Sequence, residues 1–397
     1  MMTGSMSFGE RTLGTFRGLF AIPFVVILLM TGCTDQGVVE QPPQPTPEEP
    51  GMLYDVAGQA GSNGLRGEGA PASESRLYWP IDVYVHPMEG DVYIVDWNNH
   101  CYRKIAQDGT ISTAFGSGIH GDDFDGPVRS INLNHPTDVI VGPEGDFYLA
   151  VWHNWKIKRV DKNTLYVISP VGTDAGFAGD GGPANLANLF LPSSVVFDQA
   201  GNMFISDQGN GRIRKVDTRG TINTFAGRQQ KGWRDGYGQF AMFSLQRGPD
   251  ALPGGKLAIT ATGDYLYLAD QENNRIRKIN SVTGEVTTVA GTGGVGYSGD
   301  GGQALEAQLN FPCDVTCAPN GDVYVADTHN HVVRKIDASG IITTAAGTGV
   351  SGFSPNGTLS TMAMLNNPFG VFFDGKKNTL YIADTYNSQV KRVAIPD

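Results

Sequence analysis

The stretch GDVYVADTHNHVVRKI, residues 321–336, contains two short apolar runs separated by a polar turn. The run at Val323–Ala326 is apolar at consecutive positions instead of alternating, so both faces of this strand must be covered. A small sheet packed between two similar sheets covers a strand in that way. The stretch therefore predicts a β-strand, a tight turn and a second, basic strand.

Five more copies of this stretch occur in the chain. They are GDVYIVDWNNHCYRKI from Gly90, GDFYLAVWHNWKIKRV from Gly145, GNMFISDQGNGRIRKV from Gly201, GDYLYLADQENNRIRKI from Gly263 and NTLYIADTYNSQVKRV from Asn378. The copies are 55 to 63 residues apart, which is room for four short strands and one long loop. With 53 glycines and no sustained helical period, the chain is predicted to be all-β.

The count of fourth strands predicts how the repeats close. Each unit opens with an apolar strand after a proline and ends with a strand of the VTTVAG type, except the last unit, which stops at QVKRVAIPD. The missing strand is LYDVAG, residues 53–58, near the other end of the chain. Pairing it with the last unit leaves no free sheet edge. We therefore predict a six-bladed β-propeller of four-stranded antiparallel blades, closed by residues 53–58.

These repeated phrases resemble the NHL-repeat family over residues 52–395. The fifth and third units match best, with the preceding loops GTGGVGYSGDGGQALEAQLNFP and GTDAGFAGDGGPANLANLFLP. The resemblance implies a propeller that binds ligands or partners on one rim, and related propellers include metal-dependent lyases and lactonases. The second unit departs from the pattern because Val151 replaces the recurrent aspartate.

The N-terminal segment has the layout of an export signal. Arg11 and Arg17 precede an uncharged stretch that ends in LLMTGC, a sequence similar to bacterial lipoprotein signals. We expect a signal peptide at 1–32, acylation of Cys33, a proline-rich tether at 33–50 and the propeller at 51–397. An ordinary signal peptide or a retained membrane span are the alternatives. The expected location is the bacterial cell envelope, anchored in a membrane by the lipid.

The charge of the chain limits which partners it can bind, and the spacing of its cysteines limits which disulfides it can form. The net charge of −11 disfavours nucleic acid as a partner, because phosphate binding needs clustered Lys and Arg. Cys313 and Cys317 lie about 13 Å apart if they share a strand, too far for a disulfide. We interpret both as small buried apolar residues, and we expect a monomer.

Aromatic residues in the predicted turns are candidates for ligand contact. The turn of the first unit carries Trp97 and His100, and that of the second carries Trp152, His153 and Trp155. Trp79 and Trp233 lie in loops between units. Exposed aromatic rings anchor peptide, glycan or protein partners at small entropic cost. The alternative is that the rings cover backbone or fill space between blades.

Charged residues recur at three repeat positions. We interpret the aspartates at the ends of the second strands as turn residues that accept backbone N–H groups, and the basic pairs of the third strands as solvated edge residues. Asp82, Asp138 and Asp314 each stand two residues after an opening proline, at the channel mouth. Three converging carboxylates could bind calcium, although a hydrogen bond to the adjacent loop is an alternative.

The histidines argue against a catalytic zinc site. Only His135 directly precedes an opening proline, and the other six do not all recur at one register. The favoured hypothesis is a binding module for a protein, peptide or glycan, with no catalytic residues and no required cofactor. The alternative is a metal-dependent lyase or lactonase-like enzyme with its site at the channel mouth.

Overall fold

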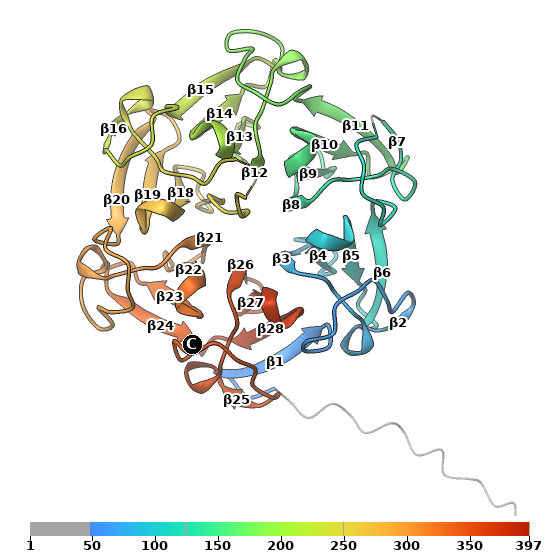
Figure 1. The fold of residues 1–397 in the computed structure, drawn as a ribbon, viewed down its shortest axis with the longest axis vertical. Helices are drawn as coiled ribbons and strands as arrows, with labels where there is room; N and C mark the ends of the chain where they lie inside the picture. Colours follow the sequence, from blue (N-terminus) through green and yellow to red (C-terminus); the bar gives the residue numbers. More distant parts are fainter. Residues whose placement is uncertain (1–47, 124, 249, 397) are drawn as a thin grey trace, which may run out of the picture. The chain divides into compact units, whose positions relative to one another are not determined.

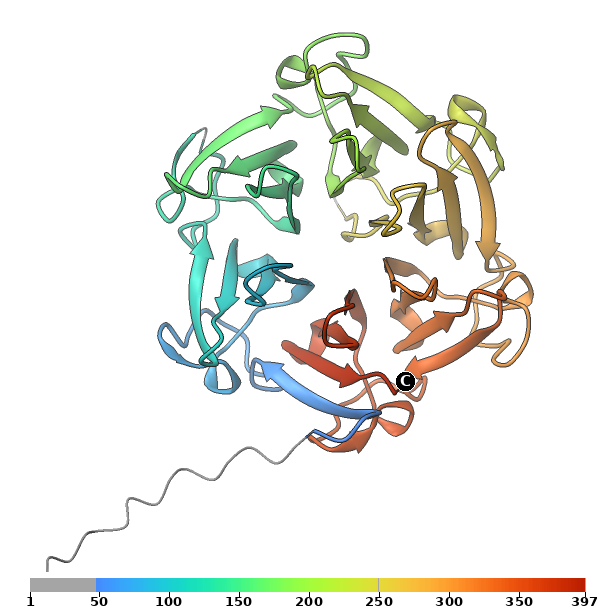
Figure 2. The same ribbon diagram turned by 180° about the vertical axis from the view of Figure 1, so that it is seen from behind.

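The computed structural model describes residues 48–123, 125–248 and 250–396. They form six antiparallel sheets arranged as a ring around a central axis, seen from its two faces in Figure 1 and Figure 2. The helices in this part of the chain are three-residue 3-10 turns, and none offers a run that could span a membrane. The predicted all-β, six-bladed propeller is confirmed.

Each blade contains four main strands, and blades are numbered here in chain order. The first, innermost strands are β3 (Pro80–Val85), β8 (Pro136–Val141), β12 (Pro192–Phe197), β17 (Leu257–Ile259), β21 (Pro312–Cys317) and β26 (Pro368–Asp374). The second strands are β4 (Val92–Asp96), β9 (Phe147–Val151), β13 (Met203–Asp207), β18 (Tyr265–Asp270), β22 (Val323–Asp327) and β27 (Thr379–Asp384).

The outer half of each blade consists of the remaining two main strands. The third strands are β5 (Cys101–Ile105), β10 (Lys156–Val160), β14 (Arg212–Val216), β19 (Arg275–Asn280), β23 (Val332–Ile336) and β28 (Gln389–Ala394). The fourth are β6 (Thr110–Phe115), β11 (Tyr166–Val171), β15 (Ile222–Gly227), β20 (Glu285–Ala290), β24 (Ile342–Ala346) and β1 (Met52–Ala57). Two-residue strands extend four blades outward: β2 (Ala70–Pro71), β7 (Gly126–Pro127), β16 (Gly236–Tyr237) and β25 (Thr358–Leu359).

A 3-10 turn joins the second strand to the third in every blade. These turns are η2 (Trp97–Asn99), η3 (Trp152–Asn154), η5 (Gln208–Asn210), η7 (Gln271–Asn273), η9 (Thr328–Asn330) and η11 (Thr385–Asn387). The residue after each turn has left-handed backbone angles, for example φ of 52° at His100. The six turns lie on one face of the ring, which we call the turn face, because each sits beside the start of a first strand; Asn98 N–H, for instance, donates to Tyr78 O.

The ring closes as predicted. Strand β1 pairs antiparallel with β28 in the register Leu53↔Val393 and Tyr54↔Arg392, and Figure 1 shows it completing the last blade. The described residues begin at Glu48, inside the predicted tether. Glu48 forms an ion pair with Arg392 of the last blade. Residues 1–32 and Cys33 lie outside the described residues. Cys101, Cys313 and Cys317 are free thiols, so Cys313 and Cys317 form no disulfide, as predicted; Cys313 is buried as expected, whereas Cys317 is half-buried.

The interpretation of the basic third strands as solvated edges is wrong for the first basic residue of each pair. Six cations are fully or almost fully buried at this one position: Arg103, Lys158, Arg214, Arg277, Arg334 and Lys391. Four of them contact a carboxylate at the end of the second strand and an acidic residue in the preceding inter-blade loop. In blade 3 these contacts are Arg214–Asp207 at 3.3 Å and Arg214–Asp180 at 2.7 Å.

The recurrent aspartates do stabilise turns, but not through the N–H groups that follow them. Asp207 Oδ1 accepts the backbone N–H of Phe190, from the loop that leads into the first strand, at 2.8 Å. Its Oδ2 accepts the Asn210 side-chain amide at 2.8 Å. The same pattern holds for Asp96, Asp270, Asp327 and Asp384. One carboxylate thus accepts hydrogen bonds from the loop and from the turn, and it also contacts the buried cation.

In blade 2, which has Val151 at the position of that aspartate, other residues make the equivalent contacts. Where Val151 stands, Asn154 Oδ1 accepts the backbone N–H of Asn134 at 2.9 Å. The buried cation is Lys158, whose ammonium donates to Asp123 O at 2.7 Å. A neutral acceptor and a shorter cation therefore replace the aspartate and the arginine together.

A first prediction concerns ring closure. Leu53 in β1 and Ile111 in β6 occupy the same position of a fourth strand, with the same burial pattern along the two strands. Leu53→Ala and Ile111→Ala should each lower the free energy of unfolding by about 2–5 kcal/mol, because each leaves a cavity in a packed interior. Urea unfolding measures both. A cost for Leu53→Ala near zero would show that β1 is not an integral strand.

Candidate functional site

The third residues of the first strands surround the central channel. A register shift leaves the second residue of the strand outside the regular ladder, and pairing resumes at the third residue, as at Pro80/Asp82 and Pro136/Asp138. In five blades this residue is Asp82, Asp138, Ser194, Asp314 or Gly370, and in blade 4 the equivalent residue is Lys256, directly before β17. The three aspartates selected from the sequence therefore belong to one ring, and Lys256 belongs to it as well.

Two of the carboxylates and the serine bond the backbone of the next blade. Asp138 accepts the N–H of Val195, and Asp314 accepts that of Val371, both at 2.8 Å. Ser194 Oγ accepts the N–H of Leu257 at 3.2 Å. Because the first strand is the inner edge of each sheet, its N–H groups need such partners. These side chains therefore join neighbouring blades around the channel.

Asp82 and Lys256 form an ion pair across the channel. Asp82 Oδ2 and Lys256 Nζ are 2.5 Å apart, and both side chains are buried. The two residues come from blades 1 and 4, which stand opposite each other in the ring (Figure 1). The sequence did not reveal Lys256 as a site residue because the opening of blade 4, PDALPGGKLAIT, has Gly254 where the other openings have the proline that marks the register. Aligning Leu257 with Val83 and Val139 places it.

The pKa values of Asp82, Asp314 and Lys256 are all raised in this ring. Burial raises the pKa of Asp82 well above its ordinary value, and Asp138 and Asp314 raise it further, while Lys256 acts in the opposite direction. Burial likewise raises the pKa of Asp314 to about 6. Burial alone would lower the pKa of Lys256, but Asp82, Asp314 and Asp138 together raise it. Lys256 is therefore charged at neutral pH, and it faces more carboxylates than it can neutralise.

A cavity of about 180 Å³ extends from this ring along the first strands. Asp82, Asp138, Lys256 and Asp314 line one end, and residues such as Tyr84, Ile140 and Phe372 line the other. The first two residues of the first strands are buried, whereas Tyr84, Ile140, Ile259 and Phe372 are half-buried. The cavity therefore opens away from the turn face, and the aspartates lie at its closed end instead of at a mouth on the turn face.

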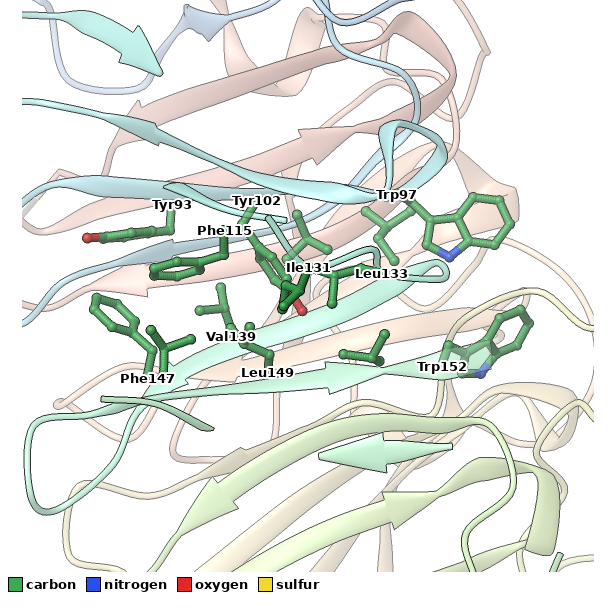
Figure 3. Packing of buried hydrophobic residues seen from close by; sticks show 14 of the residues in the cluster. Tyr93, Trp97, Tyr102, Phe115, Ile131, Leu133, Val139, Phe147, Leu149 and Trp152 are labelled. Atoms are coloured by element: carbon green, nitrogen blue, oxygen red, sulfur yellow. The ribbon is translucent and has the colours of Figure 1, made fainter. Parts of the chain in front are cut away.

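The two tryptophans expected to be exposed on the turn face are buried. Trp97 is 8% exposed and Trp152 1%, and Figure 3 shows them at one end of the apolar cluster between blades 1 and 2. Their rings are 6.1 Å apart, and Trp152 Nε1 donates to Gln208 Oε1 at 3.2 Å. The expectation of exposure is wrong because each ring follows a second strand directly and reaches across to the next blade.

The other aromatic candidates lie at several blade junctions. Trp79 stacks between Trp97, at 5.9 Å, and Tyr386, at 4.9 Å. Trp155 is half-buried after the turn of blade 2. Trp233 is 52% exposed and lies 4.1 Å from the Arg275 guanidinium, in the loop before blade 4. The structure thus brings Trp79, Trp97 and Trp152 together, whereas Trp155 and Trp233 belong to other junctions.

His100 and His153 lie with two further histidines between blades 1 and 2. The ring centres of His100 and His135 are 4.6 Å apart, and those of His135 and His153 are 4.9 Å apart. His120 lies 5.1 Å from His100. Burial and the neighbouring imidazoles lower the pKa of His100 to about 4 and that of His135 to about 3. A comparison of registers could not reveal this cluster, because its members occupy four different repeat positions.

Metal binding can be judged from the ligand atoms. Within the described ranges, no three His, Cys, Asp or Glu side chains already stand in an arrangement that could hold a metal ion. Lys256 forms an ion pair with Asp82, so one of the three carboxylates already has a cation partner. Calcium binding at Asp82, Asp138 and Asp314 stays a hypothesis from the sequence.

A second prediction tests the channel ion pair. Lys256→Met should destabilise the fold by about 3–5 kcal/mol, because it leaves buried carboxylates without a cation. Asp82→Asn combined with Lys256→Met should recover most of that loss. Thermal and urea unfolding of the two variants and the Asp82→Asn single variant give the coupling energy.

The loss in Lys256→Met should also depend on pH. A carboxyl group whose pKa is raised by folding stabilises the fold fully below its unfolded pKa and loses that contribution as the pH rises through its folded pKa. Without Lys256, Asp82 and Asp314 follow this rule more strongly. The deficit should therefore be larger at about pH 8 than at about pH 5. A deficit that does not change with pH would contradict the assignment of Lys256 as their counter-charge.

Comparisons with known proteins agree with the repeat analysis. A model of the teneurin NHL domain matches residues 255–364. Human NHL repeat-containing protein 2 is 29% identical over 299 residues, which cover 67% of this chain and 40% of that protein. The Arabidopsis thaliana protein SUPPRESSOR OF QUENCHING 1, chloroplastic, is 28% identical over 301 residues, covering 70% and 27%. This chain thus matches less than half the length of either relative.

Solved structures support the fold. An auxiliary nutrient binding protein from Bacteroides ovatus aligns with a TM-score of 0.62 at 17% identity, covering 87% of this chain and 77% of that one. At such identity the likeness establishes architecture alone. The teneurin NHL match and the NHL repeat-containing relatives, taken with the six-bladed ring, support an NHL-repeat family for this chain.

Proposed function

We propose that the protein is a binding module whose channel cavity receives a positively charged group of its ligand. Asp82, Asp138 and Asp314 face a single cation, Lys256, so the closed end of the cavity carries excess negative charge when the carboxyls are ionised. An ammonium or guanidinium group entering the cavity would offset this excess in a poorly solvated place, where charge pairing is strong. This electrostatic imbalance carries the proposal.

The dimensions of the cavity suit a side chain more than a whole ligand. Pockets for drug-sized molecules usually measure about 300–1,000 Å³, and this cavity measures about 180 Å³. Tyr84 and Phe372 meet at its open end with ring centres 5.2 Å apart. Aromatic faces attract cations. A lysine or arginine side chain, or the amino group of a peptide, therefore fits the class of protein, peptide or glycan ligand expected from the sequence.

The turn face is a weaker candidate for the main contact. Trp97 and Trp152 are buried there, so they offer no ring surface to a partner without disrupting the interface between blades. Trp79 and Trp155, with His100 and His153, are half-buried and keep some surface. They would add contacts on this face.

In this function the protein binds its ligand without catalysing a reaction, and the ligand is not a nucleic acid. The acidic composition supports the exclusion of nucleic acid. The solved propeller named as an auxiliary nutrient binding protein gives a precedent for ligand capture on this architecture. A metal-dependent lyase or lactonase with its site at the channel stays the alternative hypothesis from the sequence.

A third prediction tests ligand charge. Nα-acetyl-lysine methylamide should bind saturably in isothermal titration calorimetry, whereas the uncharged norleucine analogue should not. Asp138→Asn should weaken binding by roughly 10-fold or more, about 1.4 kcal/mol, because it removes one negative charge. This variant keeps an oxygen that can accept the Val195 N–H, so it should fold.

Glu74→Gln is the matched control, since Glu74 is exposed in the 3-10 turn Ala72–Glu74 at the outer edge of blade 1. It makes the same change of charge outside the channel and should leave binding unchanged. Equal binding of the two probes, or equal effects of the two substitutions, would rule out the channel as a cation site.

We further propose that the module is held in the cell envelope through a lipid on Cys33, which rests on the signal-like sequence alone. A fourth prediction follows: in a bacterial host, Cys33→Ser should move the protein from the membrane fraction to the soluble exported fraction and abolish labelling by a fatty-acid analogue. Cys101→Ser should change neither result. Membrane retention of Cys33→Ser would refute the anchor.

A further inference from the structure

Five of the six junctions between blades in the described part of the chain offer the same four positions, and these can be compared around the ring. They are the residue after the 3-10 turn, a loop residue bridged to the following segment, the residue before the next opening proline, and the second residue of the next turn. Between blades 1 and 2 they are His100, His120, His135 and His153. Between blades 5 and 6 they are His331, Ser351, Asn367 and Tyr386.

The fold does not require histidine at these positions. Other junctions carry Trp155, Ala175, Leu191 and Gly209, or Asn274, Val295, Phe311 and His329. The chain has seven histidines in all, and four of them fill one junction. Only His100 has an evident structural role, because its Nδ1 accepts the N–H of His135 at 3.3 Å, as His331 Nδ1 does for Asn367 at 3.1 Å.

The spacing of three of the rings, those of His100, His120 and His135, suits a shared metal ion, and His153 lies beside His135. With Zn–N distances of about 2.0–2.1 Å, the ring centres of histidines on one tetrahedral ion lie about 5.2 Å apart. The centres of His100 and His120 are 5.1 Å apart, and those of His120 and His135 are 6.0 Å apart. The His100–His135 and His135–His153 separations are 4.6 and 4.9 Å.

We propose that His100, His120, His135 and His153 form a binding site for a divalent transition metal of the zinc class on the turn face. Imidazole nitrogens suit zinc, nickel and copper, whereas calcium and magnesium prefer oxygen. This site is separate from the channel cavity and does not depend on the function proposed for it.

The histidine cluster is accessible from solvent, and neighbouring side chains hold its rings in place. His120 is exposed, and the other three histidines are half-buried, so the ion can arrive from solvent. Trp97 and Trp152 pack against His135 and His153 with ring centres 4.3 and 4.6 Å apart, which fixes one side of the cluster. Asn134 Oδ1 lies 2.8 Å from His135 Nδ1, so this nitrogen can donate to it while Nε2 is left for a metal ion.

Metal binding requires a modest rearrangement. His135 Nδ1 and His153 Nδ1 are 2.9 Å apart and share one hydrogen bond. A shared ion would therefore require these two rings to turn, so that one nitrogen of each faces the ion.

The fifth prediction tests this site with cobalt and zinc. Protein without a polyhistidine tag, stripped of metal by a chelator, should bind one Co²⁺ per chain with the visible absorption of a tetrahedral site, and Zn²⁺ should displace it. His135→Asn should weaken binding by more than the roughly 10–100-fold that loss of an outer-shell partner costs. Asparagine tolerates the positive φ at this position and occurs there as Asn367.

Two further variants make the result decisive. His153→Tyr reproduces Tyr386 of the matched junction and should also weaken binding, whereas His331→Asn should leave it unchanged. Circular dichroism of the metal-free variants checks folding, and Zn²⁺ should raise the thermal midpoint of the wild type but not of His135→Asn. Absence of stoichiometric cobalt binding, or binding retained in His135→Asn and His153→Tyr, would overturn the proposal.

Discussion

A buried cation at one position of the third strand organises every blade. A lone buried charge is strongly destabilising, so each cation must be met by oxygen atoms from elsewhere in the blade. Arg277 meets Asp270 at the end of the second strand at 2.8 Å and Asp235 of the preceding inter-blade loop at 2.6 Å. The loop between blades is therefore held against the strands, and the turn face takes its shape from this contact.

The cation is retained where its partners differ. Lys391 replaces arginine in blade 6 and pairs with Asp55, which lies on β1 itself, so the closing strand supplies a carboxylate as well as backbone hydrogen bonds. In blade 2, Lys158 and Asn154 replace the usual arginine and aspartate. Because the same geometry is reached with different residues, the constraint is the need to satisfy a buried charge.

Side chains outside this framework vary from blade to blade, and the two proposed sites use them. The channel ring consists of three aspartates, a serine, a lysine and a glycine, and the lysine forms one ion pair across the axis. The junction between blades 1 and 2 differs by gathering four histidines. The channel cavity opens away from the turn face, whereas the histidines lie on it, so the two sites can act separately.

The repeated phrases alone determined the number of blades, the strand order and the closing role of residues 53–58, because neighbours within a blade are set by local pattern and by the need to pair sheet edges. Only the tertiary structure decided what lies between blades. Contacts between different blades or their loops bury Trp97, Trp152 and Arg214. Contacts of the same kind place Lys256 among the aspartates and bring the histidines together. Such contacts depend on how the ring brings different repeat positions together, and a comparison of equal registers cannot detect them.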